Sequence, residues 1–369
     1  MSTEMQAGRR LRLHKFDGLS LFSMDSQIPT VGVAMIARDC AETIARALCS
    51  VRTIARQIVV LDTGSHDRTP TVAARLGAEV YFHPWRNDFS DARNLALDYL
   101  RTDWVLVLDS DEELDGESFR AHCPNLADPM IGGVELTIVS ALEGGITTAE
   151  HRYTRLFRRH RDIRFEGAIH EQIAASIQRA GFEIARSQVR ILHYGYQTVQ
   201  PEKIERNIAL LHAELERQPD SPWLRYHLGL AYFAAGKFDS AAALLAPLCT
   251  CPELSAEQRE LARLRAAQCA LAQDRLLEAE QFLELPCSDI HREGLRMFIV
   301  AGVLAARRKF SSALEALEHP TTCASGLVNQ LQRERFCEHL RALGATQRLQ
   351  ARTLFPLGQS HAEWQTLFR

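Results

Sequence analysis

The sequence predicts an α/β domain with a mostly parallel, Rossmann-like sheet, followed by an all-α repeat domain. Short apolar runs typical of buried strands alternate with amphipathic helical segments between residues 31 and 109. Beyond residue 201 the strand patterns stop, and apolar residues recur at helical spacing. A length of 369 residues also exceeds what one ordinary core fills, so two units are expected.

The composition is that of a globular chain without a strong field of either sign. The formal net charge is -3 and 24% of the residues are charged, which gives no reason to expect nucleic acid or anionic membrane as a partner. The nine cysteines form no CxxC pair, which argues against a zinc site or disulfide framework and favours a cytoplasmic location. No apolar run reaches the roughly 18 residues of a transmembrane segment. Residues 1–29 are expected to be an N-terminal extension.

The first elements follow in a regular order. A strand in "VGVAMIA" precedes a helix for which Asp39 and Glu42 have capping-box spacing. A second strand leads to a helix that begins at Thr69 and stops at Gly77. The strand "AEVYF", the helix "DFSDARNLALDYL" and a fourth strand ending at Asp109 complete the pattern. Strands separated by single helices predict a parallel sheet.

Acidic residues stand where three of these strands end: Asp39, Asp62 and Asp109. In such sheets ligands bind beyond the carboxyl ends of the strands, where loops and helix N-termini converge. Each residue could simply cap the next helix. Three on one rim favour a binding site.

Arg93 is expected off the core face of its helix, in the first turn. A cation there opposes the helix dipole, which typically costs about 0.3–1 kcal/mol at an exposed position. A negative partner is therefore expected. It is either an anionic ligand or a bridge to Asp88 or Asp91.

The segment "WVLVLDSDEEL" gathers four carboxylates directly after a buried strand. Their mutual repulsion in a pocket would raise their pKa values unless a cation were present, and Mn²⁺ or Mg²⁺ suits oxygen ligands and a diphosphate. Asp109 and Asp111 can share a ligand because alternate residues of an extended segment point to one side. Glu112 and Glu113 are expected to face solvent or to begin the next turn. A solvated loop, or a haloacid-dehalogenase-like phosphatase, remains the alternative.

Six segments, in this order, resemble one enzyme family. They are "VGVAMIARDCAETIARALCSV", "IVVLDTGSHDRT", "DFSDARNLAL", "WVLVLDSDEEL", "YTRLFRRHRDIRFEGAIHEQI" and "ILHYGY". Together they resemble family-2 inverting glycosyltransferases of the GT-A fold, in the branch of lipopolysaccharide-core glucosyltransferases and sublancin-type peptide S-glycosyltransferases.

The resemblance implies roles for individual residues. Asp39 and Asp62 would line the nucleoside pocket, and Arg93 would lie near the base or phosphates. Asp111, with help from Asp109, would bind the metal and the nucleotide-sugar donor. Many relatives carry paired acids where this chain has Asp62 followed by Thr63, which leaves the usual uridine nucleotide an open point.

The next segment holds the catalytic candidates. Glu166, His170 and Glu171 are titratable, and Glu171 stands where the resemblance places the catalytic base, with His170 orienting it or touching the sugar. His193 fits the position of a C-terminal metal ligand, or it is a buried structural imidazole. Tyr194 and Tyr196 could stack on a sugar or pack in the core. The six arginines from Arg152 to Arg164 form either a solvated surface or cationic contacts to a diphosphate.

The second half resembles a tetratricopeptide array. Leu228-Gly229, Tyr232 and Ala241 fall at the spacing of that repeat, and Ala279 and Ala313 mark weaker copies. The expected boundaries are 30–200 for the GT-A domain, 201–217 for a connecting helix and 218–369 for the repeats. The stack offers a concave surface for a peptide, or a cap or homodimer surface.

These features predict a metal-dependent inverting glycosyltransferase that uses a nucleotide-sugar donor, with UDP as the expected carrier. A peptide or protein acceptor is the first expectation, and lipopolysaccharide core or another glycan is the alternative. A non-catalytic scaffold is a minor alternative, against which the retained acidic and basic candidates count.

Overall fold

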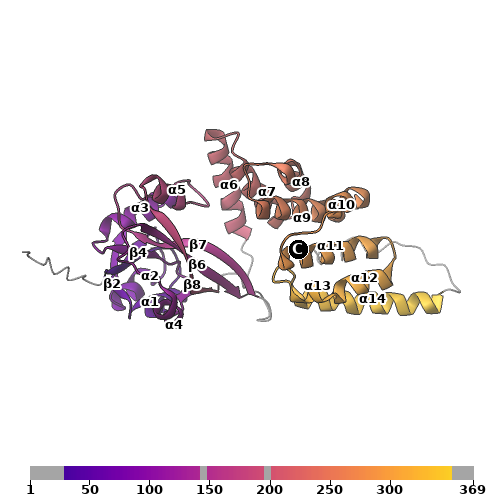
Figure 1. Ribbon diagram of the computed structural model, residues 1–369, viewed down its shortest axis with the longest axis horizontal. Coiled ribbons are helices and arrows are strands. Elements are labelled where there is room, and N and C mark those ends of the chain that lie inside the picture. Colours follow the sequence, from indigo (N-terminus) through magenta and orange to yellow (C-terminus); the bar gives the residue numbers. More distant parts are fainter. Residues whose placement is uncertain (1–28, 142–147, 195–200, 351–369) are drawn as a thin grey trace, which may run out of the picture.

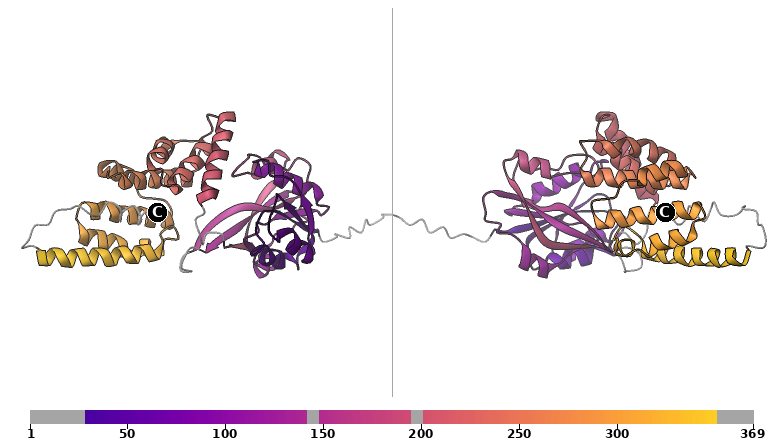
Figure 2. Two further views of the ribbon diagram at one scale, coloured as in Figure 1. Left: turned by 180° about the vertical axis from the view of Figure 1, so that it is seen from behind. Right: turned by 45° about the vertical axis from the view of Figure 1, so that its right-hand side comes forward.

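A computed structural model describes residues 29–141, 148–194 and 201–350. The strands gather in the N-terminal half and the later helices form a separate half beside it (Figures 1 and 2). The expected N-terminal extension lies, apart from residue 29, outside the described residues.

One eight-stranded sheet organises the first half, in the order β3-β2-β1-β4-β7-β6-β8-β5. The four strands β3, β2, β1 and β4 run parallel, as predicted. Beyond β4 the sheet is mixed, because β7 is antiparallel to β4 and β6, and β5 is antiparallel to β8, while β6 and β8 run parallel. The strands are β1 Val31–Ala37, β2 Ala55–Asp62, β3 Glu79–Phe82, β4 Trp104–Val107, β5 Glu112–Leu114, β6 Ile131–Ala141, β7 Thr148–Arg158 and β8 Glu183–His193.

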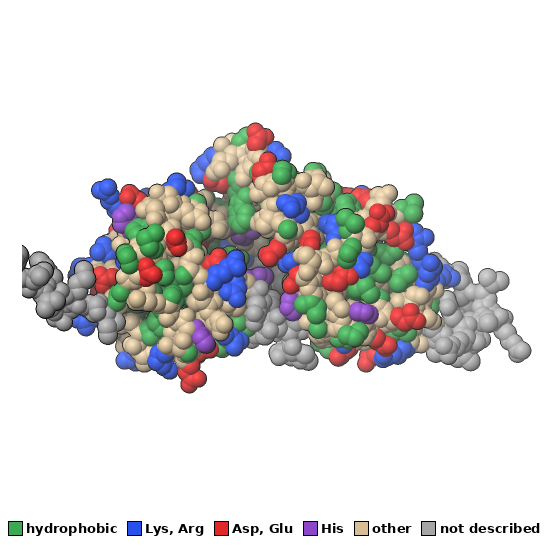
Figure 3. Space-filling view, viewed as in Figure 1, with side chains coloured by type: hydrophobic (Ala, Val, Ile, Leu, Met, Phe, Trp, Pro, Cys, Tyr) green, Lys and Arg blue, Asp and Glu red, His purple; other side chains and the backbone are tan. Residues whose placement is uncertain are grey.

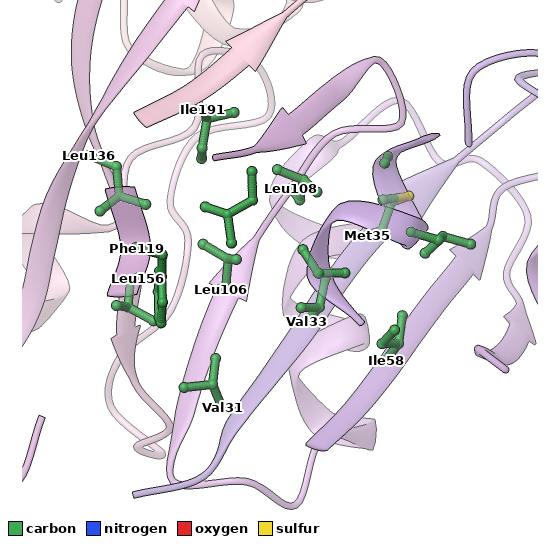
Figure 4. Packing of buried hydrophobic residues seen from close by; sticks show 14 of the residues in the cluster. Val31, Val33, Met35, Ile58, Leu106, Leu108, Phe119, Leu136, Leu156 and Ile191 are labelled. Carbon is green, nitrogen blue, oxygen red and sulfur yellow. The ribbon is translucent and has the colours of Figure 1, made fainter. Parts of the chain in front are cut away.

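Helices cover both faces of the sheet. Helices α1 (Ile44–Val51), α2 (Thr69–Arg75) and α4 (Gly116–His122) pack on one face, and α3 (Phe89–Tyr99) and α5 (Ala174–Arg179) pack on the other. Alternate residues of β4 divide between the two cores, because successive strand side chains point to opposite faces. Leu106 joins the first core and Val105 the second (Figure 4). This double burial explains why the strands read as continuous apolar runs.

The predicted capping box of the first helix is wrong. Helix α1 begins at Ile44, and its N-cap residue Thr43 makes no side-chain cap. Asp39 instead adopts a left-handed backbone with φ of 48°, and its carboxylate accepts a hydrogen bond from the His66 amide. The prediction for the second helix is confirmed, since α2 begins at Thr69 and Gly77 follows it with φ of 89°.

The second half is built from helix pairs, as predicted. Its main helices are α6 Pro201–Arg217, α7 Pro222–Ala234, α8 Phe238–Leu245, α9 Ala256–Ala272, α10 Leu276–Leu283, α11 Ile290–Ala306, α12 Phe310–Glu318, α13 Pro320–Ala324 and α14 Gln330–Gln350. The turns between α7 and α8, between α9 and α10, and between α11 and α12 each contain a residue in the left-handed backbone conformation. These residues are Gly236, Asp274 and Arg308. The alanines that mark the three repeats, Ala241, Ala279 and Ala313, are fully buried. Among the described helices, none combines the length and apolar character that a membrane span requires.

Gly229 shows how closely the first repeat packs. A Cβ atom at this position would lie 2.6 Å from Cγ of Leu245 on the partner helix. Helices α7 and α8 can therefore approach closely only because residue 229 has no side chain.

Candidate active site at the carboxyl edge of the sheet

The loops after β1 and β2 are joined at the carboxyl edge. Asp62 is 1% exposed, and its Oδ1 accepts hydrogen bonds from the amides of Gly64 and Ser65. The Asp39 amide donates to Ser65 Oγ at 2.9 Å, so the two predicted rim aspartates belong to one connected unit. Within the described residues, Asp62 Oδ2 is buried without a hydrogen-bond partner. A buried acceptor left unpaired costs about 1–3 kcal/mol, which a donor group on a ligand would offset.

Arg93 lies at the centre of an ion-pair network. Its Nη2 lies 2.9 Å from Asp109 Oδ1, and its Nε lies 2.5 Å from Glu171 Oε1. The expected negative partner therefore exists, but the bridges to Asp88 and Asp91 do not form. Asp88 caps α3 by accepting from the Asp91 amide, and Asp91 pairs with His83.

The expectation that Arg93 lies off the core face is also wrong. Its side chain is only 9% exposed, because the segment from Ile163 to Ile173 covers this side of α3. The guanidinium carbon lies 5.7 Å from the centre of the Phe165 ring. In the part of the chain that the structure describes, Nη1 is buried and has no partner. Arg93 thus retains one unused donor beside two carboxylates.

Two guanidinium groups neutralise much of the acidic cluster. Arg155 Nη2 lies 3.2 Å from Asp109 Oδ2 and 2.8 Å from Glu112 Oε1. Glu112 is 2% exposed and accepts the Asp109 amide at 2.9 Å, so the expectation that it faces solvent is wrong. Desolvation would raise the pKa of Asp109, but Arg93 and Arg155 outweigh it and hold that pKa well below its usual range. For Glu112, burial outweighs Arg155 and raises the pKa.

Asp111 and His193 face each other at the open end of the cluster. Strand β5 pairs with β8 so that Glu112 lies opposite His193, and this register brings His193 Nε2 to 3.5 Å from Asp111 Oδ2. The two side chains are 30% and 20% exposed. Burial alone would lower the pKa of His193. The hydrogen bond to Asp111 and the neighbouring carboxylates have a larger opposite effect, so the pKa lies above its usual value.

Asp111 and His193 would fit a divalent cation that binds together with a phosphate-bearing ligand. The described residues contain no group of three or more histidine, cysteine, aspartate or glutamate side chains arranged to hold a metal. Mg²⁺ commonly takes only one or two protein carboxylates, with water and substrate phosphates completing its shell. Asp111 and His193 could supply two donors, while Asp109 is engaged by the two arginines.

The arginine run is mainly structural. Arg152, Arg158 and Arg159 donate to backbone carbonyl groups, and Arg164 pairs with Asp98. Arg155 alone among the six bonds to the acidic cluster. Sequence reasoning did not single it out, because only the pairing of β7 with β4 places it beside Asp109.

The segment from Glu166 to Gln172 forms a tight loop that carries Glu171. The amides and carbonyls of its two end residues bond to each other at 2.9 Å in both directions. Helix α3 holds the loop through the Phe89 amide, which donates to the Ala168 carbonyl at 2.8 Å, and through Ser90 Oγ, which donates to the Gly167 carbonyl at 2.6 Å.

The three titratable candidates of this loop take separate directions. Glu171 bonds to Arg93, whereas Glu166 pairs with Arg179 outside the network. The His170 ring packs against His227 of α7 instead of the acidic cluster. Tyr194 donates to Glu113 at 3.1 Å, and Tyr196 lies outside the described residues.

The sheet is parallel from β3 to β4 and mixed beyond β4, and it carries helices on both faces, which is a GT-A-like arrangement. The acidic turn follows β4, and β8 brings His193 to that turn. Residues 32–184 match the family model described as Glycosyl transferase family 2, so this part of the chain is similar to domains of that family.

Two curated proteins are also similar to this chain. The chain is 35% identical to a TPR repeat-containing protein of Synechococcus elongatus over 211 residues, which are 56% of this chain and 50% of that protein. It is 26% identical to the glycosyltransferase SunS of Bacillus subtilis over 209 residues, which are 54% of this chain and 48% of that protein. The chain thus spans about half the length of these relatives.

Among solved structures, the glucosyl-3-phosphoglycerate synthase of Mycobacterium tuberculosis in complex with Mn²⁺ and UDP-glucose is 19% identical. The match covers 51% of this chain and 79% of that chain, with a TM-score of 0.38.

Proposed function

We propose that the protein is a metal-dependent inverting glycosyltransferase that takes its sugar from a nucleotide-sugar donor. The observation that supports this most directly is that the family-2 domain brings Asp111, His193, Arg93 and Glu171 to one edge of its sheet. Both charged partners needed for group transfer meet there: a cation site for the leaving diphosphate and a carboxylate for the acceptor.

In this proposal the nucleotide-sugar donor binds at the carboxyl edge of the sheet. The connected loops of Asp39 and Asp62 receive the nucleoside, and Asp62 Oδ2 accepts one of its polar hydrogens. Mn²⁺ or Mg²⁺, held by Asp111 and His193 with support from Asp109, would stabilise the charge that develops on the leaving diphosphate. UDP is the carrier that the resemblance favours. In this proposal the buried Nη1 of Arg93 donates a hydrogen bond to the nucleotide sugar, which lies beside Asp109.

Glu171 is the base. An inverting transfer needs a group that takes the acceptor proton as the acceptor attacks the anomeric carbon from the face opposite the diphosphate. Arg93 binds Glu171 through Oε1, and Oε2 is the oxygen that we assign to the acceptor proton. The guanidinium also fixes the direction of this carboxylate, because Nε and Nη2 are held by two acidic groups at once.

The acceptor is a peptide or protein in this proposal, since stacked helix pairs present an extended surface suited to a chain-like partner. A glycan acceptor, such as lipopolysaccharide core, is the second candidate. A thiol acceptor would depend less on Glu171, because a thiol is already partly ionised near neutral pH. Use of the helical half as a homodimer surface is the competing role for these repeats, and light scattering on the purified chain would detect it.

Calorimetric titration of UDP, GDP and their sugar conjugates, first with Mn²⁺ and then with EDTA, tests the donor half of the proposal. Metal-dependent binding of one nucleotide is expected, and it should weaken at least tenfold in Asp111→Ala. Binding that ignores EDTA would contradict the metal role. No binding of any nucleotide would favour the scaffold alternative.

Acceptor profiling tests the other half. The protein, the identified donor and Mn²⁺ are incubated with a peptide library and, separately, with core oligosaccharides, and transfer is followed by mass spectrometry. Transfer to peptides is expected. Transfer confined to glycans would replace the first acceptor class by the second.

A further inference from the structure

The loop that carries Glu171 touches the helical half as well as α3. Ile169 is 4% exposed and packs in one apolar cluster with Ile208 and Leu211 of α6 and Leu224 and Leu228 of α7. Figure 3 shows a hollow between the two halves, with hydrophobic and histidine side chains on its walls. Helices α6 and α7 therefore pack directly against the loop of residues 166–172 that carries Glu171.

One contact between the loop of residues 166–172 and helix α7 is a stack of two aromatic rings. The rings of His170 and His227 stack with centroids 3.9 Å apart and an interplanar angle of 21°. Trp223, one turn earlier on α7, meets His227 edge-on at 4.3 Å. His170 is thus pressed against a ring that α7 itself holds in place.

The imidazole ring of His227 has a nitrogen atom that the surrounding described residues leave without a hydrogen bond. Among the described residues, its Nε2 is buried without a hydrogen-bond partner. Burial, with a smaller contribution from His170, lowers the pKa of His227 to about 2, so the ring is neutral at physiological pH. Burial also lowers the pKa of His170, so the two stacked rings do not repel each other as two cations would.

The backbone at His170 needs such support. Its φ is 52°, in the left-handed region that residues other than glycine rarely adopt. Helix α3 fixes the carbonyls of Gly167 and Ala168, three and two residues earlier. Between these anchors and Glu171, the side chain of His170 is held by the stack on α7.

We propose that His227 is a positioning residue: its ring, stacked on His170, fixes the left-handed turn that aims Glu171 at Arg93. The inference rests on the proposed function, since it assigns a role toward Glu171 as the base. It also makes helix α7 a part of the active site, in addition to any role in acceptor binding.

Three variants of the full chain test this: His227→Ala removes the ring, His227→Phe keeps a flat ring, and His212→Ala is the matched control. His212 lies on α6 and contacts Tyr232 instead of the catalytic loop. We expect kcat to fall about tenfold or more in H227A with donor KM unchanged, and to recover to at least half of the wild-type value in H227F. The control should keep the wild-type kcat.

Hydrogen exchange of residues 167–172 provides a readout that does not need turnover. Exchange should be faster in H227A than in wild type, and close to wild type in H227F and H212A. If H227A does not fold, His227→Leu, which fills space without a flat ring, takes its place with the same expectations.

The outcomes separate the two proposals. Unchanged kcat and exchange in H227A, or an H227F variant as impaired as H227A, would overturn the positioning role while leaving the glycosyltransferase proposal intact. A wild-type protein that transfers no sugar would overturn the proposed function, and the exchange experiment would still decide whether His227 fixes the loop.

Discussion

Replacing Arg93 by methionine should destabilise the protein, chiefly through Glu171. Arg93 makes two charge-assisted contacts, at 2.9 Å to Asp109 and 2.5 Å to Glu171. Asp109 would keep Arg155 at 3.2 Å, whereas Glu171, whose side chain is 13% exposed, would lose its cation. Breaking a buried pair by removing one partner costs about 3–5 kcal/mol, so R93M should lower the free energy of unfolding by about that amount.

A double-mutant cycle isolates this effect. Glu171→Gln alone should cost about 1.5–3 kcal/mol, the net value of a hydrogen bond to a charged group. The double variant should be at least about 2 kcal/mol more stable than the sum of the two single effects, because no orphan charge remains. Urea denaturation, followed by the fluorescence of the fully buried Trp104, measures all four proteins. Additivity within about 0.5 kcal/mol would refute the coupling of these two residues.

Three further predictions concern catalysis and packing. Glu171→Gln should abolish sugar transfer while leaving nucleotide affinity within twofold, as measured by kcat and calorimetry; turnover within tenfold of wild type would remove Glu171 as the base. Arg308→Gly should raise stability by about 0.5 kcal/mol in urea denaturation, because the left-handed backbone, with φ of 61°, costs a non-glycine residue about 1–2 kcal/mol and glycine returns part of this as entropy; a less stable variant would contradict this account. Gly229→Ala should lower stability by about 1–3 kcal/mol, because its Cβ would overlap Leu245 at 2.6 Å, and an unchanged urea midpoint would mean that α8 can move away.

The elements that local patterns determine were predictable. Strand periodicity located the parallel half of the sheet, and the repeat spacing located the helix pairs, including the buried alanines at 241, 279 and 313. The rim position of Asp62 and Asp109 followed from strand ends alone. Each of these features depends on residues within one or two elements.

Features that depend on register between distant strands were not predictable. The buried role of Glu112 requires Arg155 from β7. The approach of His193 to Asp111 requires the pairing of β5 with β8, and it was expected only because the family resemblance places both residues at one metal site. The burial of Arg93 depends on the loop that closes over α3. Asp88 and Asp91, five and two residues before Arg93, bond to other groups, so sequence distance gave the wrong partner.

Among the described strands, β5 has a single neighbour in the sheet, and that neighbour, β8, is the last of them along the chain. Glu113 and Tyr194, which hydrogen-bond across this end of the sheet, are 81 residues apart. At a translation rate of about 5–20 residues per second, the acidic turn leaves the ribosome roughly 4–16 s before its partner strand. The nascent chain can therefore build its parallel half-sheet and still lack the histidine side of the site. The acidic turn gains the neighbour that places His193 beside Asp111 only after the chain has grown past β8.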